Sequence, residues 1–303
     1  MGSRVLPAAV AGAVAAFGLA SSHPHVIARI ATGGHPCESV AAAGALWVAN
    51  DGGGTVVRVN PRTNRVTARV RAGQGACAIA AAKHAVWVAN YRTGRLLRVD
   101  TRTLKVRRVA VGGAPFDVLV AGGRVWATGF ENGTLVEVDA RTVGVIRRIK
   151  IGGAPTGLLR AAGSIWVGLG RGATDVLRID PVSGTARRVD VGLPAPTHFV
   201  ATKSGIWVAD DGDGLALLDP QDGHVLKVTH VGRTIGQPAV SADGTIWAPD
   251  KEIDTIFRLN PATGKVIDSF RGGDGAFQVL RAFGSMWVTS YAGSKVWRFS
   301  TTR

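Results

Sequence analysis

The feature that most constrains the fold of this chain is a tryptophan that recurs about every forty residues. The intervals between successive copies are 40, 39, 40, 41, 40 and 40 residues. The recurring residues are Trp47, Trp87, Trp126, Trp166, Trp207, Trp247 and Trp287. A repeat of this length is typical of propellers and solenoids, in which each unit buries its apolar faces against its neighbours. The sequence therefore predicts seven copies of one structural unit.

The pattern inside a unit distinguishes a propeller from a helical solenoid. In the unit around Trp166, residues 155–163 form a short apolar run, and each of three following runs alternates between apolar and other residues. Those three runs are residues 164–170, 175–181 and 186–192. Turn residues separate the runs, as expected for four short strands. Helical repeats would need a 3.6-residue periodicity, which the unit does not have. Each unit is therefore predicted to be a blade of a propeller.

The two ends of the chain predict how the ring closes. The last unit stops after its third predicted strand, and residues 26–37 align with residues 66–77 at an offset of 40. Pairing of the two ends would remove the exposed edges of an open sheet. We therefore expect an all-β, seven-bladed β-propeller of four-stranded antiparallel blades, spanning residues 21–303. The N-terminal strand completes the last blade.

The first twenty residues have the pattern of a secretory signal. Arg4 precedes an apolar run of small residues from Val5 to Ala20, and Gly18 and Ala20 suit a cleavage site. We expect residues 1–20 to be a signal peptide and the protein to be secreted or extracytoplasmic, in the cell envelope. The run is short for a membrane-spanning helix, and an uncleaved anchor is the alternative. No other long apolar stretch occurs.

The charge of the chain is strongly positive. There are 36 Lys and Arg against 21 Asp and Glu, a formal net charge of +15. Such a surface attracts anionic polymers, so an anionic polymer of the envelope or a nucleic acid is one expected partner, and a small-molecule ligand is another. A simpler explanation is an arginine-rich composition spread over solvated strand edges, because no compact Lys/Arg run occurs. We expect a monomer without a transmembrane segment in the mature chain.

Several short motifs resemble known propeller families. The sequence WVAN at 47–50 and 87–90, and WVTS at 287–290, resemble the YVTN β-propeller repeat. The chain is also similar to the virginiamycin B (streptogramin) lyase family, whose blades carry a similar second strand. That second resemblance implies a histidine-containing site working with magnesium, and here His198 and Asp210 match only part of the set. A gluconolactonase-like site would need Glu, Asn and Asp, for which Glu38, Asn90 and Asp210 are available.

The candidate site residues are those that differ between blades where the blades are otherwise alike. In a propeller, the loops before the first strand and after the second strand share one face around the axis. The position nine residues before each tryptophan and the positions three and four residues after it vary from blade to blade. The expected ligand-contacting residues of this axial funnel are Asn50, Asn90, Tyr91, Asp117, Asp211, Lys251, Gln278 and Tyr291.

Catalytic and metal-binding roles are a second interpretation of the same funnel. His198 and Asp210 are the candidate acid and base. Glu38, Asp210 and Asp250 are candidate ligands of a divalent cation such as Mg²⁺ or Ca²⁺, because carboxylates are the hard ligands that such ions prefer. A hydrated polar funnel without a metal is the alternative, since no compact metal-binding motif occurs.

The two cysteines occupy the same position in consecutive repeats. Cys37 and Cys77 both lie ten residues before a tryptophan. Inner strands of neighbouring blades converge on the axis, so the pair is expected to form a disulfide, with two buried thiols as the alternative.

Two functions are consistent with all of these features. The first is an extracytoplasmic binding or scaffold module, and the second is a metal-dependent lyase-like or lactonase-like enzyme acting in the funnel.

Overall fold

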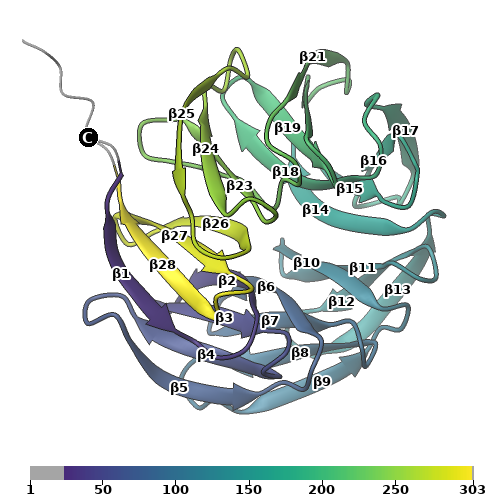
Figure 1. The fold of residues 1–303 in the computed structure, drawn as a ribbon. Helices are drawn as coiled ribbons and strands as arrows, with labels where there is room; N and C mark the ends of the chain where they lie inside the picture. Colours follow the sequence, from purple (N-terminus) through teal and green to yellow (C-terminus); the bar gives the residue numbers. More distant parts are fainter. Residues whose placement is uncertain (1–23, 302–303) are drawn as a thin grey trace, which may run out of the picture.

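The computed structural model describes residues 24–301, and the predicted signal peptide, residues 1–20, lies outside the described residues. Within that range the chain forms 28 strands and no helix, arranged as seven four-stranded antiparallel sheets around a central axis (Figure 1). The predicted all-β, seven-bladed propeller is confirmed. No helix of the described residues has the length and apolar character needed to cross a membrane.

The first four blades follow one another with nearly identical strand bounds. Blade 1 consists of β2 (Pro36–Ala42), β3 (Ala45–Asn50), β4 (Thr55–Asn60) and β5 (Arg65–Arg71). Blade 2 consists of β6 (Ala76–Ala82), β7 (Ala85–Asn90), β8 (Arg95–Asp100) and β9 (Val106–Ala110). Blade 3 consists of β10 (Pro115–Ala121), β11 (Arg124–Gly129), β12 (Thr134–Asp139) and β13 (Gly144–Lys150). Blade 4 consists of β14 (Pro155–Ala161), β15 (Ser164–Leu169), β16 (Asp175–Ile179) and β17 (Ala186–Asp190).

The last three blades include one shortened strand and the closure of the ring. Blade 5 consists of β18 (Pro196–Thr202), β19 (Gly205–Asp210), β20 (Gly214–Leu218) and β21 (Val225–His230). Blade 6 consists of β22 (Ala239–Val240), β23 (Ile246–Asp250), β24 (Thr255–Leu259) and β25 (Val266–Arg271). Blade 7 consists of β26 (Ala276–Ala282), β27 (Ser285–Ser290), β28 (Lys295–Ser300) and the N-terminal strand β1 (Val26–Ala31).

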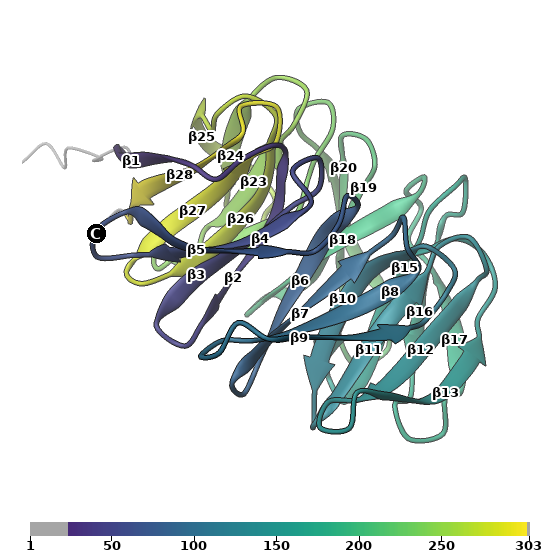
Figure 2. The same ribbon diagram turned by 90° about the horizontal axis from the view of Figure 1, so that it is seen from below.

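The N-terminal strand closes the ring as the repeat predicts. β1 pairs antiparallel with β28, and Ile30 lies opposite Val296 in the register. Figure 2 shows the ring from a direction turned by 90°, with β1 beside β28. Both termini of the described chain are thereby fixed in one sheet, and β1 completes the seventh blade as its fourth strand.

The repeated tryptophans form the packing between blades. All seven are at most 2% exposed. Trp47 of blade 1, for example, belongs to the same apolar cluster as Val86 and Val88 of blade 2. A buried tryptophan side chain removes roughly 200 Å² from water, which corresponds to about 5 kcal/mol of transfer free energy. A single blade cannot bury these side chains alone, and this is why the sequence repeats.

Arginines on the third strands of blades 4 and 7 connect these two blades to the next. Arg178 and Arg298 lie opposite the tryptophan of their own blade in the strand register. The Arg298 Nη1 donates to the carbonyl oxygen of Pro61 at 2.5 Å, and Arg178 donates to that of Gln221. Pro61 and Gln221 lie in the turn between the third and fourth strands of the following blade, so these arginines have an inter-blade role.

Blade 6 departs from the regular pattern at its inner strand. β22 has two residues, whereas the other inner strands have seven. Pro238 precedes β22 and has no N–H to donate to a sheet. The neighbouring Gln237 instead forms a parallel bridge to Gln278 of blade 7, and Gln237 N donates to the Phe277 carbonyl at 2.9 Å. Gly236 lies directly against the Phe277 backbone, because a Cβ there would lie 2.0 Å from that same oxygen.

Candidate functional site

The candidate site is a cavity of about 650 Å³ at the axis of the ring. It opens on the face that carries the loops before the first strand and after the second strand of each blade. Every blade except the sixth contributes a first-strand residue or its flanking loop, and blade 6 contributes Lys251 from the loop after its second strand. A cavity of this size is in the range of small-molecule sites.

Three positions of the repeat supply most of the lining. The position four residues after the tryptophan contributes Tyr91, Phe130, Gly170, Asp211 and Lys251. The position nine residues before it contributes Glu38 and His198. The position ten residues before it contributes Cys77, Phe116, Thr156, Thr197 and Phe277. The last position was not among those that the sequence singled out, although the two cysteines occupy it.

A continuous row of rings crosses the funnel. Phe130 stacks on Phe116 with centroids 5.6 Å apart, and Phe116 lies 6.4 Å from the imidazole of His198. The row continues from His198 to Phe277 at 6.1 Å and from Phe277 to Tyr291 at 6.1 Å. We call Phe116, Phe130, His198, Phe277 and Tyr291 the ring row. Aromatic pairs at these separations attract each other through their quadrupoles, and their exposed faces stack with a bound ring.

Each end of the ring row is extended by a polar or cationic group. The guanidinium of Arg171 lies over Phe130, 4.3 Å from the ring centroid. At the other end, the imidazole of His35 stacks on Tyr291 at 4.8 Å. Cations over aromatic faces are held by electrostatic attraction. The funnel lining therefore combines apolar ring faces with charged residues of both signs, Arg171 and Lys251 on one side and Glu131 and Asp211 on the other.

His198 is held uncharged by its position in the row. The side chain is buried, and burial lowers the pKa of His198 to about 4, with a smaller lowering effect from the Lys251 charge and an opposing effect from Asp211. Lys251 and Asp211 form an ion pair at 2.9 Å between blades 6 and 5. At neutral pH the ring row therefore presents a neutral imidazole, with both charges of the pair at the mouth of the cavity.

The predicted partner of His198 points elsewhere. The Asp210 carboxylate accepts hydrogen bonds from the backbone N–H groups of Gly212 and Gly214, at 2.7 and 3.0 Å. Burial raises the pKa of Asp210. Asp210 is not among the residues that line the cavity, and no hydrogen bond joins it to His198 in the described residues. The structure thus does not bring the two candidate catalytic residues together.

The other residues three positions after a tryptophan also stabilise their own loops. The Asn90 amide donates to the carbonyl oxygen of Ala72 at 3.0 Å, and the Asn50 amide donates to that of Thr32 at 3.3 Å. Asp250 accepts from the backbone N–H of Arg233 at 2.6 Å. These side chains end the second strand and point away from the residue that follows, since successive side chains of a strand alternate. The funnel is lined by that following position.

Glu38, Asp117 and Gln278 join neighbouring inner strands. Glu38 Oε2 accepts from the N–H of Ile79 at 3.1 Å, and Asp117 Oδ2 accepts from that of Leu158 at 2.6 Å. Gln278 Oε1 accepts from the backbone N–H of Ser39. This is the same inter-blade contact, made by a side-chain amide in place of a carboxylate. Each polar side chain therefore fastens its blade to the next one around the axis. Glu38 also reaches the cavity lining.

Burial changes the ionisation of the two carboxylates in this set. Burial raises the pKa of Asp117 to about 6, against the effect of the hydrogen bonds from Leu158 and Val118. Burial, followed by the charge of Asp117, raises the pKa of Glu38 well above its usual value. The two groups repel each other when both are ionised, and one of them stays protonated in moderately acidic solution.

The expected metal ligands do not converge. Asp210 and Asp250 accept backbone hydrogen bonds in separate loops, and Glu38 binds Ile79. Residues 24–301 contain no group of three or more His, Cys, Asp or Glu side chains arranged to hold a metal ion. The residues that the funnel does present are therefore a poor fit to a bound divalent cation, and we derive no chemistry through one.

Cys37 and Cys77 form a disulfide between the first inner strands of blades 1 and 2. Their Cα atoms are 5.0 Å apart and the two positions are separated by 40 residues. Cys77 borders the cavity and Cys37 is 3% exposed. The bridge lies next to Glu38, so it fixes one wall of the funnel.

Comparisons with known proteins identify the architecture. No family model matches the chain, and no curated protein matches it. Solved structures do match. A catalytically inactive histidine-to-alanine variant of virginiamycin B lyase from Staphylococcus aureus, with quinupristin, superposes with a TM-score of 0.76 over 92% of this chain and 98% of its own, at 13% identity. The Cps50 (Swd1) β-propeller domain of Myceliophteria thermophila superposes with a TM-score of 0.78 over 92% and 100%, also at 13% identity.

The chain is a seven-bladed β-propeller. At 13% identity these likenesses show the fold alone, because propellers host unrelated functions. Membership of the YVTN repeat family, which the WVAN motifs suggest, is not supported by a family model. The site must therefore be interpreted from its own residues.

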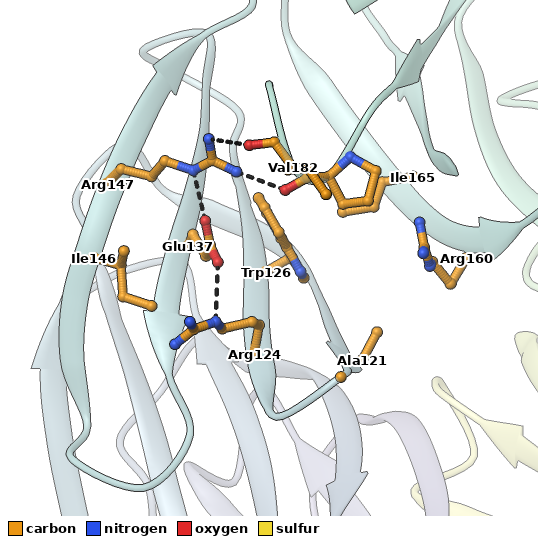
Figure 3. Close-up of a pocket in the computed structure, with 11 residues that line it drawn as sticks. Ala121, Arg124, Trp126, Glu137, Ile146, Arg147, Arg160, Ile165 and Val182 are labelled. Atoms are coloured by element: carbon orange, nitrogen blue, oxygen red, sulfur yellow. Dashed lines mark hydrogen bonds and ion pairs between the residues drawn. The ribbon is translucent and has the colours of Figure 1, made fainter. Parts of the chain in front are cut away.

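A second hollow of about 520 Å³ lies between blades 3 and 4 on the opposite face (Figure 3). Glu137 forms ion pairs with Arg124 at 3.3 Å and with Arg147 at 2.6 Å. Arg147 also donates to the carbonyl oxygens of Pro181 and Val182 at 2.6 and 3.1 Å. Here Glu137 occupies the position that arginine holds in most other blades, and Arg147 supplies the inter-blade contact instead. The residues of this hollow serve the packing contact between blades 3 and 4, so the axial cavity is the better candidate site.

Proposed function

We propose that this propeller is a binding module that takes up a small organic molecule with an aromatic or heteroaromatic ring in its axial funnel. The observation that supports the proposal is the ring row, four of whose five members line the cavity of about 650 Å³, where the acids and bases do not converge. A flat ligand ring that stacks on these aromatic side chains buries much apolar area. The cost in side-chain entropy is small, because the protein rings are already held by their neighbours.

The charge at the mouth indicates the second feature of the ligand. Arg171 lies over Phe130 and borders the cavity, as does the acidic residue Glu131, while the charge of Lys251 is offset by Asp211. A ligand whose ring stacks on the ring row and whose anionic substituent lies beside the Arg171 guanidinium would satisfy both the ring row and Arg171. We therefore expect aromatic carboxylates and related anions to bind more tightly than neutral aromatics of the same size.

The experiment that tests this proposal compares matched ligands on matched variants. Isothermal titration of the protein with a panel of aromatic carboxylates and their saturated-ring analogues should give saturable binding for the aromatic members only. Phe130→Leu and Phe277→Leu should each weaken binding about 5- to 50-fold, which corresponds to roughly 1–2 kcal/mol of lost stacking and contact.

A control variant separates loss of the site from loss of stability. Phe283→Leu makes the same change in a turn outside the cavity lining, where the side chain is 38% exposed, and should leave binding unchanged. If saturated analogues bind as well as aromatic ones, or if Phe283→Leu weakens binding as much as Phe277→Leu, the proposal fails.

A location outside the cytoplasm is part of the proposal. The signal-like start of the chain supports it, and so does the Cys37–Cys77 disulfide, because disulfides persist in oxidising compartments. Fractionation of cells that express the full chain, followed by N-terminal sequencing of the extracytoplasmic product, tests it. Cleavage after Ala20 is the expected result.

Catalysis in the funnel is a second candidate, favoured by one observation. His198 is a histidine that borders the cavity with an uncharged ring at neutral pH. An unprotonated imidazole accepts protons, although a pKa of about 4 makes it a weak base. A His198→Gln variant that still binds a ligand but no longer transforms it would support catalysis, whereas unchanged ligand after prolonged incubation with the wild type would exclude it.

A further inference from the structure

The outermost strands of blades 1 to 4 carry a band of positive charge that the proposed funnel function does not use. Ten cations lie on β5, β9, β13 and β17, with Asp190 as the one carboxylate of these four fully described strands. We call this set the arginine band. Its members are Arg65, Arg69, Arg71, Arg107, Arg108, Arg147, Arg148, Lys150, Arg187 and Arg188.

The band arises from the repeat itself. The pairs at 107–108, 147–148 and 187–188 are spaced by 40 residues, so they occupy one position on the fourth strands of three consecutive blades. Because neighbouring side chains of a strand point to opposite faces, each pair flanks its strand on both sides. In Figure 1, β5, β9, β13 and β17 follow one another along the outer edge of the ring.

The rest of the rim is different in kind. The outer strands of blades 5, 6 and 7 are β21, β25 and β1, and together they carry three Lys and Arg residues. Apolar side chains are exposed there instead, and these are Ile27, Leu226, Val228, Val266 and Ile267. The positive charge is therefore concentrated on one part of the rim, which a uniform arginine-rich composition would not produce.

Most cations of the band form no ion pair within residues 24–301. Four of its members, Arg65, Arg71, Arg108 and Arg187, are exposed and make no side-chain hydrogen bond or ion pair with other residues in the 24–301 range. Arg107 and Arg148 donate to backbone carbonyls of a neighbouring blade, which uses N–H groups but leaves the charge. Only Arg147 and Arg188 form ion pairs, with Glu137 and Asp175.

We infer that the arginine band is a docking surface for a flexible, linear polymer of phosphate groups. Nine of its ten cations are arginines, whose planar guanidinium matches phosphate oxygens in a bidentate manner. The band curves with the rim of the ring, so a chain that bends easily follows it better than a rigid duplex. None of the four strands carries an aromatic side chain on which a nucleobase could stack.

The test uses the full chain and long-chain inorganic polyphosphate as the probe. In the band variant, Arg65, Arg71, Arg108 and Arg187 are each replaced by Gln, which removes cations that have no internal partner. The matched control replaces Lys203, Lys227, Lys265 and Arg281 by Gln, which removes the same charge from exposed positions of blades 5 to 7. Affinity is measured by fluorescence anisotropy from 50 to 300 mM salt.

The band variant should bind polyphosphate about tenfold or more weakly near 150 mM salt. Its slope of log K against log salt should be shallower, because a protein that makes fewer phosphate contacts releases fewer counterions on binding. The control variant should stay within about twofold of the wild type. Equal weakening in both variants would show that only net charge matters and would overturn the inference. Tighter binding of duplex DNA than of polyphosphate by the wild type would also overturn it, in favour of a nucleic-acid partner. Neither outcome bears on ligand binding in the funnel.

Discussion

The hydroxyl of Tyr291, on blade 7, donates a hydrogen bond of 2.7 Å to the Asp51 carboxylate of blade 1. The other oxygen of that carboxylate accepts from the hydroxyl of Tyr91, on blade 2, at 3.1 Å. The chain contains two tyrosines, and both bind this one group. Three consecutive blades, including the one that closes the ring, are therefore connected through a single side chain at the mouth of the funnel.

The substitution Asp51→Asn should lower the pKa of Tyr291. Burial raises this pKa first, and the hydrogen bond to Asp51 and the Asp51 charge raise it further. The amide introduced by the substitution would keep an acceptor oxygen but remove the negative charge that opposes tyrosinate formation. Absorbance at 295 nm reports both tyrosines and no others, so the titration is direct. An unchanged titration curve would contradict the role assigned to Asp51.

Replacement of Asp117 by Asn should change how stability depends on pH. Burial raises the pKa of Asp117 from 3.8 to about 6. The folded state therefore holds this proton more tightly than the unfolded chain, so the group's stabilising contribution is complete in acid and is lost as the pH rises through 6. The expected loss is on the order of 3 kcal/mol in the free energy of unfolding.

Urea unfolding between pH 4 and pH 7 measures this effect as a difference between wild type and Asp117→Asn. The comparison cancels the repulsion among the many surface cations, which both proteins share. The variant should gain stability relative to the wild type as the pH increases. A constant difference across the range would show that Asp117 titrates normally.

The repeat made the architecture accessible from sequence. The tryptophan spacing, the offset between residues 26–37 and 66–77, and the alternation within a unit all express one requirement, that identical blades cover one another. Each blade shows this requirement in its own sequence, and the pattern recurs seven times, so the fold can be predicted from several independent copies. The shortening of the inner strand β22 was not predicted. It accompanies Pro238, and it also depends on the close approach of the blade 7 backbone to Gly236, which the sequence does not show.

The funnel was predicted less completely for a physical reason. Variation between blades pointed to the face on which the axial cavity opens, and Tyr91, Asp211, Lys251, His198 and Glu38 do border that cavity. This variation did not distinguish the position four residues after the tryptophan, which lines the funnel, from the position three residues after it, which ends the second strand. Which of the two side chains faces the funnel depends on the conformation of the loop.

The residues that sequence analysis missed are mostly apolar. Phe116, Phe130 and Phe277 were not among the expected ligand-contacting residues, because polar groups were taken as the sign of a site. The signal that could have found two of them was present, since Phe116 and Phe277 share the position of the two cysteines, ten residues before the tryptophan. The arginine band was missed in a similar way. Its pairs form no compact run along the sequence and come together only when the 40-residue spacing is applied to charge.

Reduction of the Cys37–Cys77 disulfide should destabilise the ring. The bridge closes a loop of about 40 residues, and its loss increases the entropy of the unfolded chain by an amount equivalent to about 3–4 kcal/mol. Urea unfolding with and without a reductant measures this, and a Cys37→Ala, Cys77→Ala variant should match the reduced protein under both conditions. Peptide mapping without reduction checks the linkage itself. Equal midpoints for oxidised and reduced wild type would argue against any contribution from the bridge.

His198 should remain uncharged from pH 5 to pH 8 and gain a proton only near pH 4. Burial lowers the pKa of His198 from 6.5 to about 4, and the Lys251 charge adds to the effect. The neutral ring is favoured in the folded state, so this contribution to stability is present above pH 6.5 and is lost as the pH falls towards 4. Nitrogen-15 chemical shifts of the imidazole, assigned with a His198→Gln variant, measure the titration. Lys251→Gln should raise this pKa, because it removes a nearby positive charge while burial persists. A midpoint above 6 in the wild type would mean that water reaches the centre of the ring row, and stacking of a ligand on the ring row would then lose its basis.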